Sequence, residues 1–311
     1  MILRLHAVRV WTSCLILSTA PATRAADPPA PPRFQSGVEV IRVSVSVTDE
    51  KDRYVSGLAE DAFTVFEDGV RQDLSFFARD AMPLSVALLV DCSASMEQKI
   101  GVAQEAGARF LRALRPGDLA EVVQFNDRVR VLQDWSNDAA VLEAALRGTR
   151  PSGATVLYNA LYVTLKELRT QGTPDVPRRR AVVLLSDGED TASLATEDQV
   201  LELAREAEIA IYAIRLRSEL PMARERESQY LAKYFLTVLA RDTGGQVFFP
   251  DRLNDLQSVY ARIAADLRSQ YTLGYVSSNA ARDGRWRRIQ VRTSQNGALR
   301  SRHKLGYYGA R

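Results

Sequence analysis

Residues 84–95 have the sequence LSVALLVDCSAS, an apolar run that ends in alternating polar residues. Residues 84–90 are apolar except for Ser85, a pattern typical of a parallel strand buried on both faces. The polar residues Asp91, Ser93 and Ser95 follow at once, and a helical pattern of apolar residues begins at Ile100. The stretch therefore predicts a central strand of an α/β sheet with a polar loop at its carboxyl end.

The same alternation of strand and helix continues along the chain. Further strands are predicted at residues 120–125, 181–185, 209–214 and 246–249, and helices at residues 100–114, 139–146, 157–168, 197–207, 230–239 and 253–267. Residues 129–135 are predicted to form an antiparallel edge strand, because no helix separates them from the strand before. The fold class predicted for residues 82–268 is a doubly wound, mostly parallel α/β sheet of the Rossmann-like type.

The regions on either side of this domain have β patterns. Residues 38–47 alternate with period two, and short strands follow as far as residue 80, with a hairpin signal at Glu67-Asp68-Gly69. Residues 270–311 return to strands at 271–276, 286–292 and 300–307. We expect segments 38–80 and 270–311 to pack together as one small β-sandwich, with the α/β domain inserted between them. Two separate β appendages are the alternative.

The N-terminus has the features of a secretory signal peptide. Arg4 and Arg9 precede a short apolar run, and small residues at 20–26 offer a cleavage site. The run is too short for a bilayer, which needs about 20 apolar residues. We predict a signal peptide at 1–26, a Pro-rich linker at 27–37, no transmembrane segment after cleavage, and a periplasmic or extracellular location. A leader retained as an anchor is the alternative.

Charge and cysteine content argue against several classes of protein. The chain has 41 basic and 38 acidic residues, and three of the arginines lie in the predicted leader, which has no acidic residue. The mature chain is then formally neutral, so no nucleic-acid partner is expected. Its one cysteine, Cys92, leaves no internal disulfide. We interpret the basic residues of the C-terminal segment as mostly solvent-facing: Arg285, Arg287, Arg288, Arg292, Arg300, Arg302 and Lys304.

Three polar loops are predicted to meet at the carboxyl edge of the sheet, where ligand sites of open α/β sheets lie. The first contains Asp91, Ser93 and Ser95, the second contains Thr155 at the start of a helix, and the third contains Asp187 after a later strand. Carboxylate and hydroxyl oxygens suit a hard cation, so the expected metal is Mg²⁺, with Mn²⁺ or Ca²⁺ as alternatives to it. A dication coordinated by so few carboxylates can accept a further carboxylate from a partner.

These motifs together resemble the metal-ion-dependent adhesion site of von Willebrand factor A and integrin inserted domains. The flanking sequences FTVFEDG (63–69) and YTLGY (271–275) resemble a bacterial group of exported proteins built on that domain. The resemblance implies that Asp91, Ser93 and Ser95 supply ligands directly or through water. It also implies that Thr155 closes the site when a ligand is bound, and that Asp187 binds through water. Cys92 and Ala94 depart from residues common in the family without removing a ligand.

Each of these residues also has an ordinary structural interpretation. Ser95 and Thr155 could be helix N-caps, and Asp187-Gly188 could be a plain turn. We interpret Glu189 and Asp190 as solvated loop residues or as groups that support the ligands, and Cys92 as a small buried residue. The agreement of three motifs in the right order favours a metal site formed by Asp91, Ser93, Ser95, Thr155 and Asp187.

The sequence favours a binding module over an enzyme. The mature chain has a single histidine, His303, far from the predicted site, and no Gly-x-x-x-x-Gly-Lys-Ser/Thr loop for nucleotide phosphates. We therefore expect a metal-dependent adhesion module of the bacterial cell envelope that holds an Asp or Glu of a protein partner. The alternatives are a metal-assisted hydrolase and a structural envelope protein whose metal site is vestigial.

Overall fold

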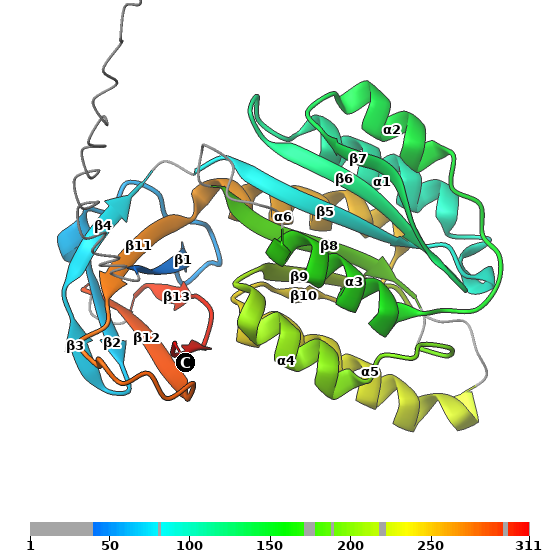
Figure 1. Cartoon of the computed structure of the whole chain (residues 1–311). Coiled ribbons are helices and arrows are strands. Elements are labelled where there is room, and N and C mark those ends of the chain that lie inside the picture. Colours follow the sequence, from blue (N-terminus) through cyan, green and yellow to red (C-terminus); the bar gives the residue numbers. More distant parts are fainter. Residues whose placement is uncertain are drawn as a thin grey trace, which may run out of the picture. The chain divides into compact units, whose positions relative to one another are not determined.

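A six-stranded sheet forms the centre of the α/β domain (Figure 1), with strand order β10-β9-β8-β5-β6-β7. The computed structural model describes residues 40–79, 82–170, 178–187, 190–217, 222–294 and 298–310. The six strands are β5 (Leu84–Asp91), β6 (Leu119–Phe125), β7 (Val129–Ser136), β8 (Arg179–Ser186), β9 (Ala210–Arg215) and β10 (Val247–Phe248). Neighbouring strands are parallel except β6 and β7, which are antiparallel. The predicted mostly parallel sheet and its antiparallel edge strand are confirmed.

Helices cover both faces of this sheet, as expected for a doubly wound fold. They are α1 (Ile100–Arg112), α2 (Ala139–Arg147), α3 (Leu157–Thr170), α4 (Glu197–Ala207), α5 (Met222–Thr243) and α6 (Leu256–Ser269), with short 3₁₀ turns η1 (Glu60–Ala62), η2 (Ala94–Met96) and η3 (Leu253–Asp255). Apolar side chains of α1, α2 and α6 pack on one face, and those of α3, α4 and α5 pack on the other. Figure 1 shows α3 and α6 on opposite sides of the strands.

Strand β5 is the most completely buried element of the sheet. All eight of its residues are buried, and successive side chains enter opposite apolar layers. Leu88 and Val90 contribute to the layer with α1, whereas Ala87 and Leu89 contribute to the layer with α3. The continuous apolar run at 84–90 therefore reflects a strand that has helices on both sides.

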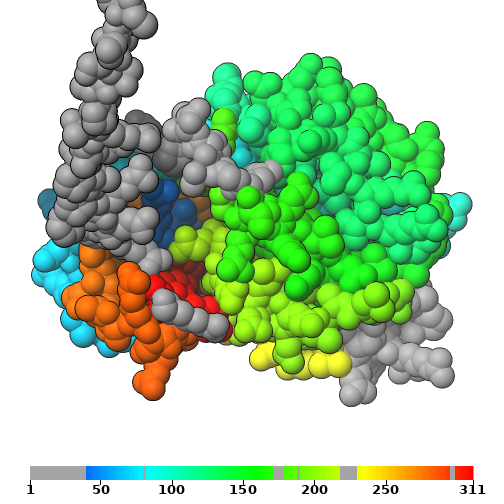
Figure 2. All heavy atoms as spheres, in the orientation of Figure 1, coloured from blue at the N-terminus to red at the C-terminus, as the bar shows by residue number. Residues whose placement is uncertain are grey.

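The remaining strands form two four-stranded sheets in the orders β13-β1-β11-β4 and β14-β12-β2-β3. Their bounds are β1 (Val40–Thr48), β2 (Phe63–Glu67), β3 (Val70–Gln72), β4 (Leu74–Ala78), β11 (Tyr271–Val276), β12 (Trp286–Thr293), β13 (Arg300–Arg302) and β14 (Gly306–Tyr308). Each sheet combines strands from both ends of the chain: β1 pairs with β11 and β13, and β2 pairs with β12. Figure 2 shows atoms of the N-terminal strands beside those of the C-terminal strands. The predicted sandwich is confirmed, and two separate β appendages are excluded.

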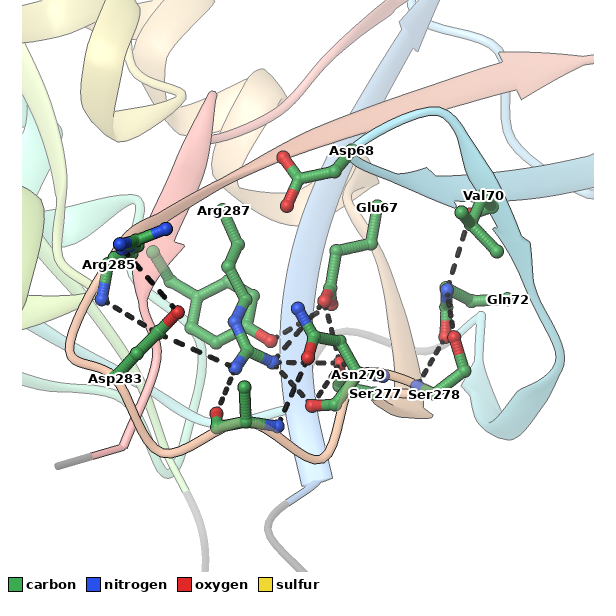
Figure 3. A network of polar contacts seen from close by, with 12 residues as sticks. Glu67, Asp68, Val70, Gln72, Ser277, Ser278, Asn279, Asp283, Arg285 and Arg287 are labelled. Carbon is green, nitrogen blue, oxygen red and sulfur yellow. Dashed lines mark hydrogen bonds and ion pairs between the residues drawn. The ribbon is translucent and has the colours of Figure 1, made fainter.

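A buried polar network lies inside this sandwich (Figure 3). The Glu67 carboxylate accepts hydrogen bonds from the hydroxyl groups of Tyr275 and Tyr307, at 2.9 Å each, and of Ser277, at 2.6 Å. The guanidinium of Arg287 lies 3.4 Å from the same carboxylate, and both side chains are at most 5% exposed. The expectation that the basic C-terminal residues are mostly solvated is therefore wrong for Arg287. Arg287 lies on the same face of β12 as the buried residues Ile289 and Val291.

The C-terminal end of the sandwich differs from the sequence prediction. One strand was expected over residues 300–307, but the structure has two, because the chain passes from one sheet to the other. Strand β13 pairs with β1, and β14 pairs with β12. Arg302, also expected in a solvated pattern, forms an ion pair with the fully buried Asp266 of α6.

Several predictions fall outside the described residues. The signal peptide at 1–26 and the linker at 27–37 belong to this group, as do Gly188 and Glu189. Among the described residues, no helix combines the length and the apolar character needed to cross a bilayer.

Candidate metal centre

Three loops meet at the carboxyl edge of the central sheet. The loop after β5 is joined to the loop before α3 by two backbone hydrogen bonds, from Ser152 N to the Cys92 carbonyl (2.8 Å) and from Ala94 N to the Gly153 carbonyl (3.1 Å). Gly153 has a φ of +75°, in the left-handed region that glycine adopts at little cost. The predicted convergence of the first two loops is therefore visible in the backbone.

The first carboxylate of the candidate site, Asp91, is fully buried at the end of β5. Its Oδ1 accepts a hydrogen bond from the Ser93 backbone N–H at 2.8 Å, and its Oδ2 accepts one from the Ser186 hydroxyl at 2.5 Å. Burial raises the pKa of Asp91, whereas the hydrogen bonds from Ser186 and Ser93 act in the opposite direction. The contacts hold the carboxylate in one orientation.

Hydroxyl groups connect the first loop to the second carboxylate. The oxygen atoms of Ser93 and Ser95 are 3.0 Å apart, and the Ser95 hydroxyl donates to Asp187 Oδ1 at 2.7 Å. Asp187 directly follows β8 and is fully buried. Four of the five predicted ligands are thus linked by short polar contacts, although they are separated by up to 96 positions in sequence.

Lys99 completes this cluster, although it was not among the predicted site residues. Its ammonium group lies 2.5 Å from Asp187 Oδ2, and the Lys99 side chain is only 5% exposed. The sequence signal was weak, because a lysine just before an amphipathic helix normally faces solvent. Ser186, which fixes Asp91, was also not assigned a role. The contacts of Lys99 and Ser186 with the carboxylates depend on how β5, β8 and the start of α1 pack together.

Thr155 belongs to the same edge through the backbone of its loop. Its N–H donates to the Thr191 hydroxyl at 3.0 Å, and its carbonyl accepts from the Thr191 N–H at 2.9 Å. The Thr155 residue is 5% exposed. These contacts anchor the loop on the segment that follows Asp187.

The N-terminus of α3 is capped by residues other than Thr155. Asp190 Oδ1 accepts from Tyr158 N at 3.0 Å, and the Ser193 hydroxyl accepts from Asn159 N at 2.9 Å. Asp190 also accepts from the Ser193 hydroxyl and backbone N–H. Asp190 therefore stabilises the N-terminus of α3 through its hydrogen bonds with Tyr158 and Ser193.

The candidate site opens to solvent on one side. Asp91, Ser93 and Asp187 are buried, whereas Ser95 and the neighbouring loop residues 152–154 are exposed. A ligand from another molecule can therefore approach over Ser95 without displacing a packed element.

The donor atoms at this edge fit a hard divalent cation. They are carboxylate and hydroxyl oxygens, the ligands that Mg²⁺, Mn²⁺ and Ca²⁺ prefer, and the nearby thiol of Cys92 is buried and disfavoured as a thiolate because burial raises its pKa to about 12. Each carboxylate keeps one oxygen in a contact that fixes it, with Ser186 or Lys99. The other oxygen of each lies on the side of the two serines.

Comparison with known proteins agrees with this fold. Residues 86–189 match the family model of the von Willebrand factor type A domain. This chain contains a von Willebrand factor A domain. The inter-alpha-trypsin inhibitor heavy chain H1 of Sus scrofa is 28% identical over 207 residues, which cover 61% of this chain and 22% of that protein. The chain thus spans about a fifth of the length of the curated relatives it matches.

Solved structures of the same type are also similar to this chain. The von Willebrand factor domain of the type V pili tip protein Mfa5 from Porphyromonas gingivalis has a TM-score of 0.48 at 14% identity and covers 59% of this chain and 94% of its own. A von Willebrand factor type A protein from Catenulispora acidiphila has a TM-score of 0.48 at 13% identity, with 89% and 76% covered. The family model, which matches residues 86–189, covers residues 86–91 of β5 and all five candidate ligands.

Proposed function

We propose that this protein is a metal-dependent binding module of the bacterial cell envelope and not an enzyme. In this proposal a divalent cation, Mg²⁺ in the first place, is held by Asp91, Ser93, Ser95, Thr155 and Asp187. The cation supplies an open coordination position that accepts a carboxylate of a protein partner. Von Willebrand factor A domains commonly mediate adhesion between proteins, which supports the general role.

The contact between Lys99 and Asp187 is the main observation that supports this proposal. Two carboxylates and one ammonium give the cluster one net negative formal charge, so a bound dication leaves one net positive charge. Without Lys99 the two carboxylates would just neutralise the metal. A positive charge in a largely desolvated site favours an anionic ligand, and a carboxylate of Asp or Glu provides both the charge and the oxygen.

The position of His303 also favours binding over hydrolysis. The imidazole lies in the sandwich, where its Nε2 is 3.1 Å from the donating Val291 N–H and its Nδ1 is 2.7 Å from the Lys304 carbonyl. Both ring nitrogens form hydrogen bonds with the backbone, so this histidine has a structural role. A hydrolase would need its general base from another residue.

The test uses residues 27–311 as bait for envelope proteins in Mg²⁺ or in chelator. Wild-type protein and Asp198→Ala, which changes an exposed acidic residue of α4, are expected to capture the same partner in Mg²⁺ only. Asp91→Ala should capture none, and amidation of the partner's carboxylates should abolish its capture. Equal capture by Asp91→Ala, or capture that survives chelation, contradicts the proposal. Cleavage of the captured partner by wild-type protein would favour the hydrolase instead.

A further inference from the structure

Three acidic residues from three different elements meet on the face of the sheet that α3 covers. Glu121 lies in β6, Asp134 in β7 and Glu167 in α3, and one carboxylate oxygen from each is within 4.8 Å of the others. No ion pair involves any of the three within the described ranges. Three carboxylates this close repel one another unless a proton or a cation lies between them.

The burial of Glu121 distinguishes this cluster from an ordinary group of surface acidic residues. Its residue is fully buried, and neither carboxylate oxygen has a hydrogen-bond partner. Its strand neighbour in β5 is Ala87, and the adjoining layer is formed by apolar residues such as Leu165 and Leu168. An unpaired carboxylate in such surroundings is strongly unfavourable, since a buried polar group normally finds a partner. The partner that Glu121 requires must come from the direction of Asp134 and Glu167.

The three acidic residues differ in their exposure to solvent, and Glu121 is the most buried. Glu167 is half-buried and Asp134 is exposed at the edge of the sheet. Asp134 Oδ1 accepts a hydrogen bond from the Trp135 backbone N–H at 2.7 Å, which fixes one of its oxygens. Solvent therefore reaches the cluster from the side of Asp134, at the edge of the sheet.

The apolar surroundings of Glu121 favour calcium over magnesium. Two ligand oxygens on opposite sides of Ca²⁺ are about 4.8 Å apart at bond lengths of about 2.4 Å, whereas the corresponding separation for Mg²⁺ is about 4.1 Å. The separations in the cluster are at most 4.8 Å, so they lie within the span of a Ca²⁺ ion. Calcium also accepts carboxylates in one- or two-oxygen geometry, while magnesium retains several waters for which the dry side at Glu121 offers little room.

We propose that Glu121, Asp134 and Glu167 form a calcium site in the A domain, separate from the candidate metal centre at Asp91. The two sites lie at different heights of the same strands. Asp91 pairs with Phe125 and Ala87 pairs with Glu121, so they are four residues apart, or about 13 Å at about 3.3 Å per residue. Calcium at Glu121 would join α3 to β6 and β7.

The carboxyl group of Glu121 holds a proton more readily than that of an ordinary glutamate. Burial, and then the charges of Glu167 and Asp134, raise the pKa of Glu121 to about 8. Near neutral pH, Glu121 without calcium therefore keeps a proton, which calcium displaces on binding. Calcium affinity accordingly increases with pH.

The experiment uses residues 27–311 with Tb³⁺ as a luminescent substitute for Ca²⁺. Trp135 packs against the apolar layer that contains Leu165 and Leu168, on the face of the sheet where the cluster lies, so its indole is placed to sensitise Tb³⁺ emission there. Wild-type protein should show sensitised emission that Ca²⁺ displaces and Mg²⁺ does not, together with a Ca²⁺-dependent increase in Tm. Trp135→Phe should lose the emission and keep the increase in Tm.

Matched variants separate this site from the one at Asp91. Glu121→Gln and Glu167→Gln should each bind Tb³⁺ and Ca²⁺ at least about tenfold more weakly, the loss of about 1.4 kcal/mol of binding energy. Glu202→Gln, which changes an exposed glutamate of α4, and Asp91→Ala should both retain the signal. Unchanged Ca²⁺ affinity in Glu121→Gln and Glu167→Gln, or loss of all Ca²⁺ binding in Asp91→Ala, overturns the proposal. Either result leaves the function proposed for Asp91 untouched.

Discussion

The ammonium group of Lys99 lies 2.5 Å from the carboxylate of Asp187, and both side chains are almost completely buried. The pair joins the start of α1 to the end of β8 at the candidate metal centre. A buried ion pair contributes little net stability by itself, but the removal of one partner leaves an uncompensated charge. Lys99 therefore affects both the stability of the domain without metal and its affinity for a cation.

Replacement of Lys99 by methionine should have opposite effects on these two properties. In chelator, Lys99→Met should be less stable by about 3–5 kcal/mol, because Asp187 loses its only charged partner among the described residues. Its Mg²⁺ affinity should increase by about tenfold or more, since one positive charge beside the metal is removed. Thermal unfolding and calorimetry measure the two effects, with Lys51→Met as an exposed control. Equal stability of Lys99→Met and wild-type protein in chelator would contradict the role given to the pair.

Replacement of Asp91 by alanine should abolish Mg²⁺ binding. Calorimetry of wild-type protein should show a single weak Mg²⁺ event, and Asp91→Ala should show none. Wild-type protein should remain folded in chelator, because the ligands come from a sheet edge that β5 and β8 have already formed. Retention of the event in Asp91→Ala would mean that the metal binds elsewhere, and its absence from wild-type protein would favour a vestigial site.

Replacement of Thr155 by alanine tests the role that the family resemblance implies. Thr155→Ala should keep most of its Mg²⁺ affinity and lose partner affinity by about tenfold or more, the equivalent of about 1.4 kcal/mol. Its Tm should change little, because the α3 terminus is capped by Asp190 and Ser193. Asp190→Ala is the matched capping variant. It should lower Tm, because the loss of a helix cap decreases the free energy of unfolding by about 1 kcal/mol. A lower Tm with normal partner binding in Thr155→Ala would show that this residue only supports the loop.

Deletion of residues 270–311 should expose strands at the other end of the chain. Strand β1 lies between β11 and β13, both of which the deletion removes. The amides of Val43, Val45 and Val47 should then lose protection from hydrogen exchange. Full protection of these amides in the truncated protein would mean that segment 38–80 folds independently.

Protonation of His303 should destabilise the protein at acidic pH. Burial lowers the pKa of His303 below its ordinary value of 6.5, and the Val291 N–H points at Nε2, which must remain an acceptor. Below pH 6.5 the unfolded chain binds the proton more readily than the folded one, so stability decreases as pH falls towards the folded-state pKa. Unfolding free energy against pH should show this decrease in wild-type protein. His303→Gln should lack that component, and an identical pH profile in both proteins would argue against it.

Much of the fold could be read from local patterns. The apolar run at 84–90, the period-two strands and the helical stripes all reflect which faces of each element are buried. Buried positions recur every two residues in a half-buried strand and every three to four residues in a helix. The predicted convergence of Asp91 and Asp187 followed from the same patterns, since parallel strands end at one edge of a sheet. The domain boundaries and the metal ligands themselves remain predictions.

Other features had no local signature. Nothing in the sequence near Lys99 indicates that its ammonium lies on Asp187, and residues 300–307 do not show where the chain changes sheets. Arg287 was misjudged because an arginine in a strand usually faces solvent. Its guanidinium is buried because it contacts Glu67, 220 positions earlier, and the backbone carbonyl of Asn279.

The sequence alone determined the order of strands and helices and the kinds of atom at the end of β5, because both depend on short-range periodicity and residue type. Tertiary structure decided which charges lie together: Lys99 with Asp187, Arg287 with Glu67, and Glu121 with Asp134 and Glu167. Each of these groups comes from at least two elements, and their distances depend on how helices and strands pack. Electrostatic interactions vary with distance and burial, so these contacts exist only in the folded protein.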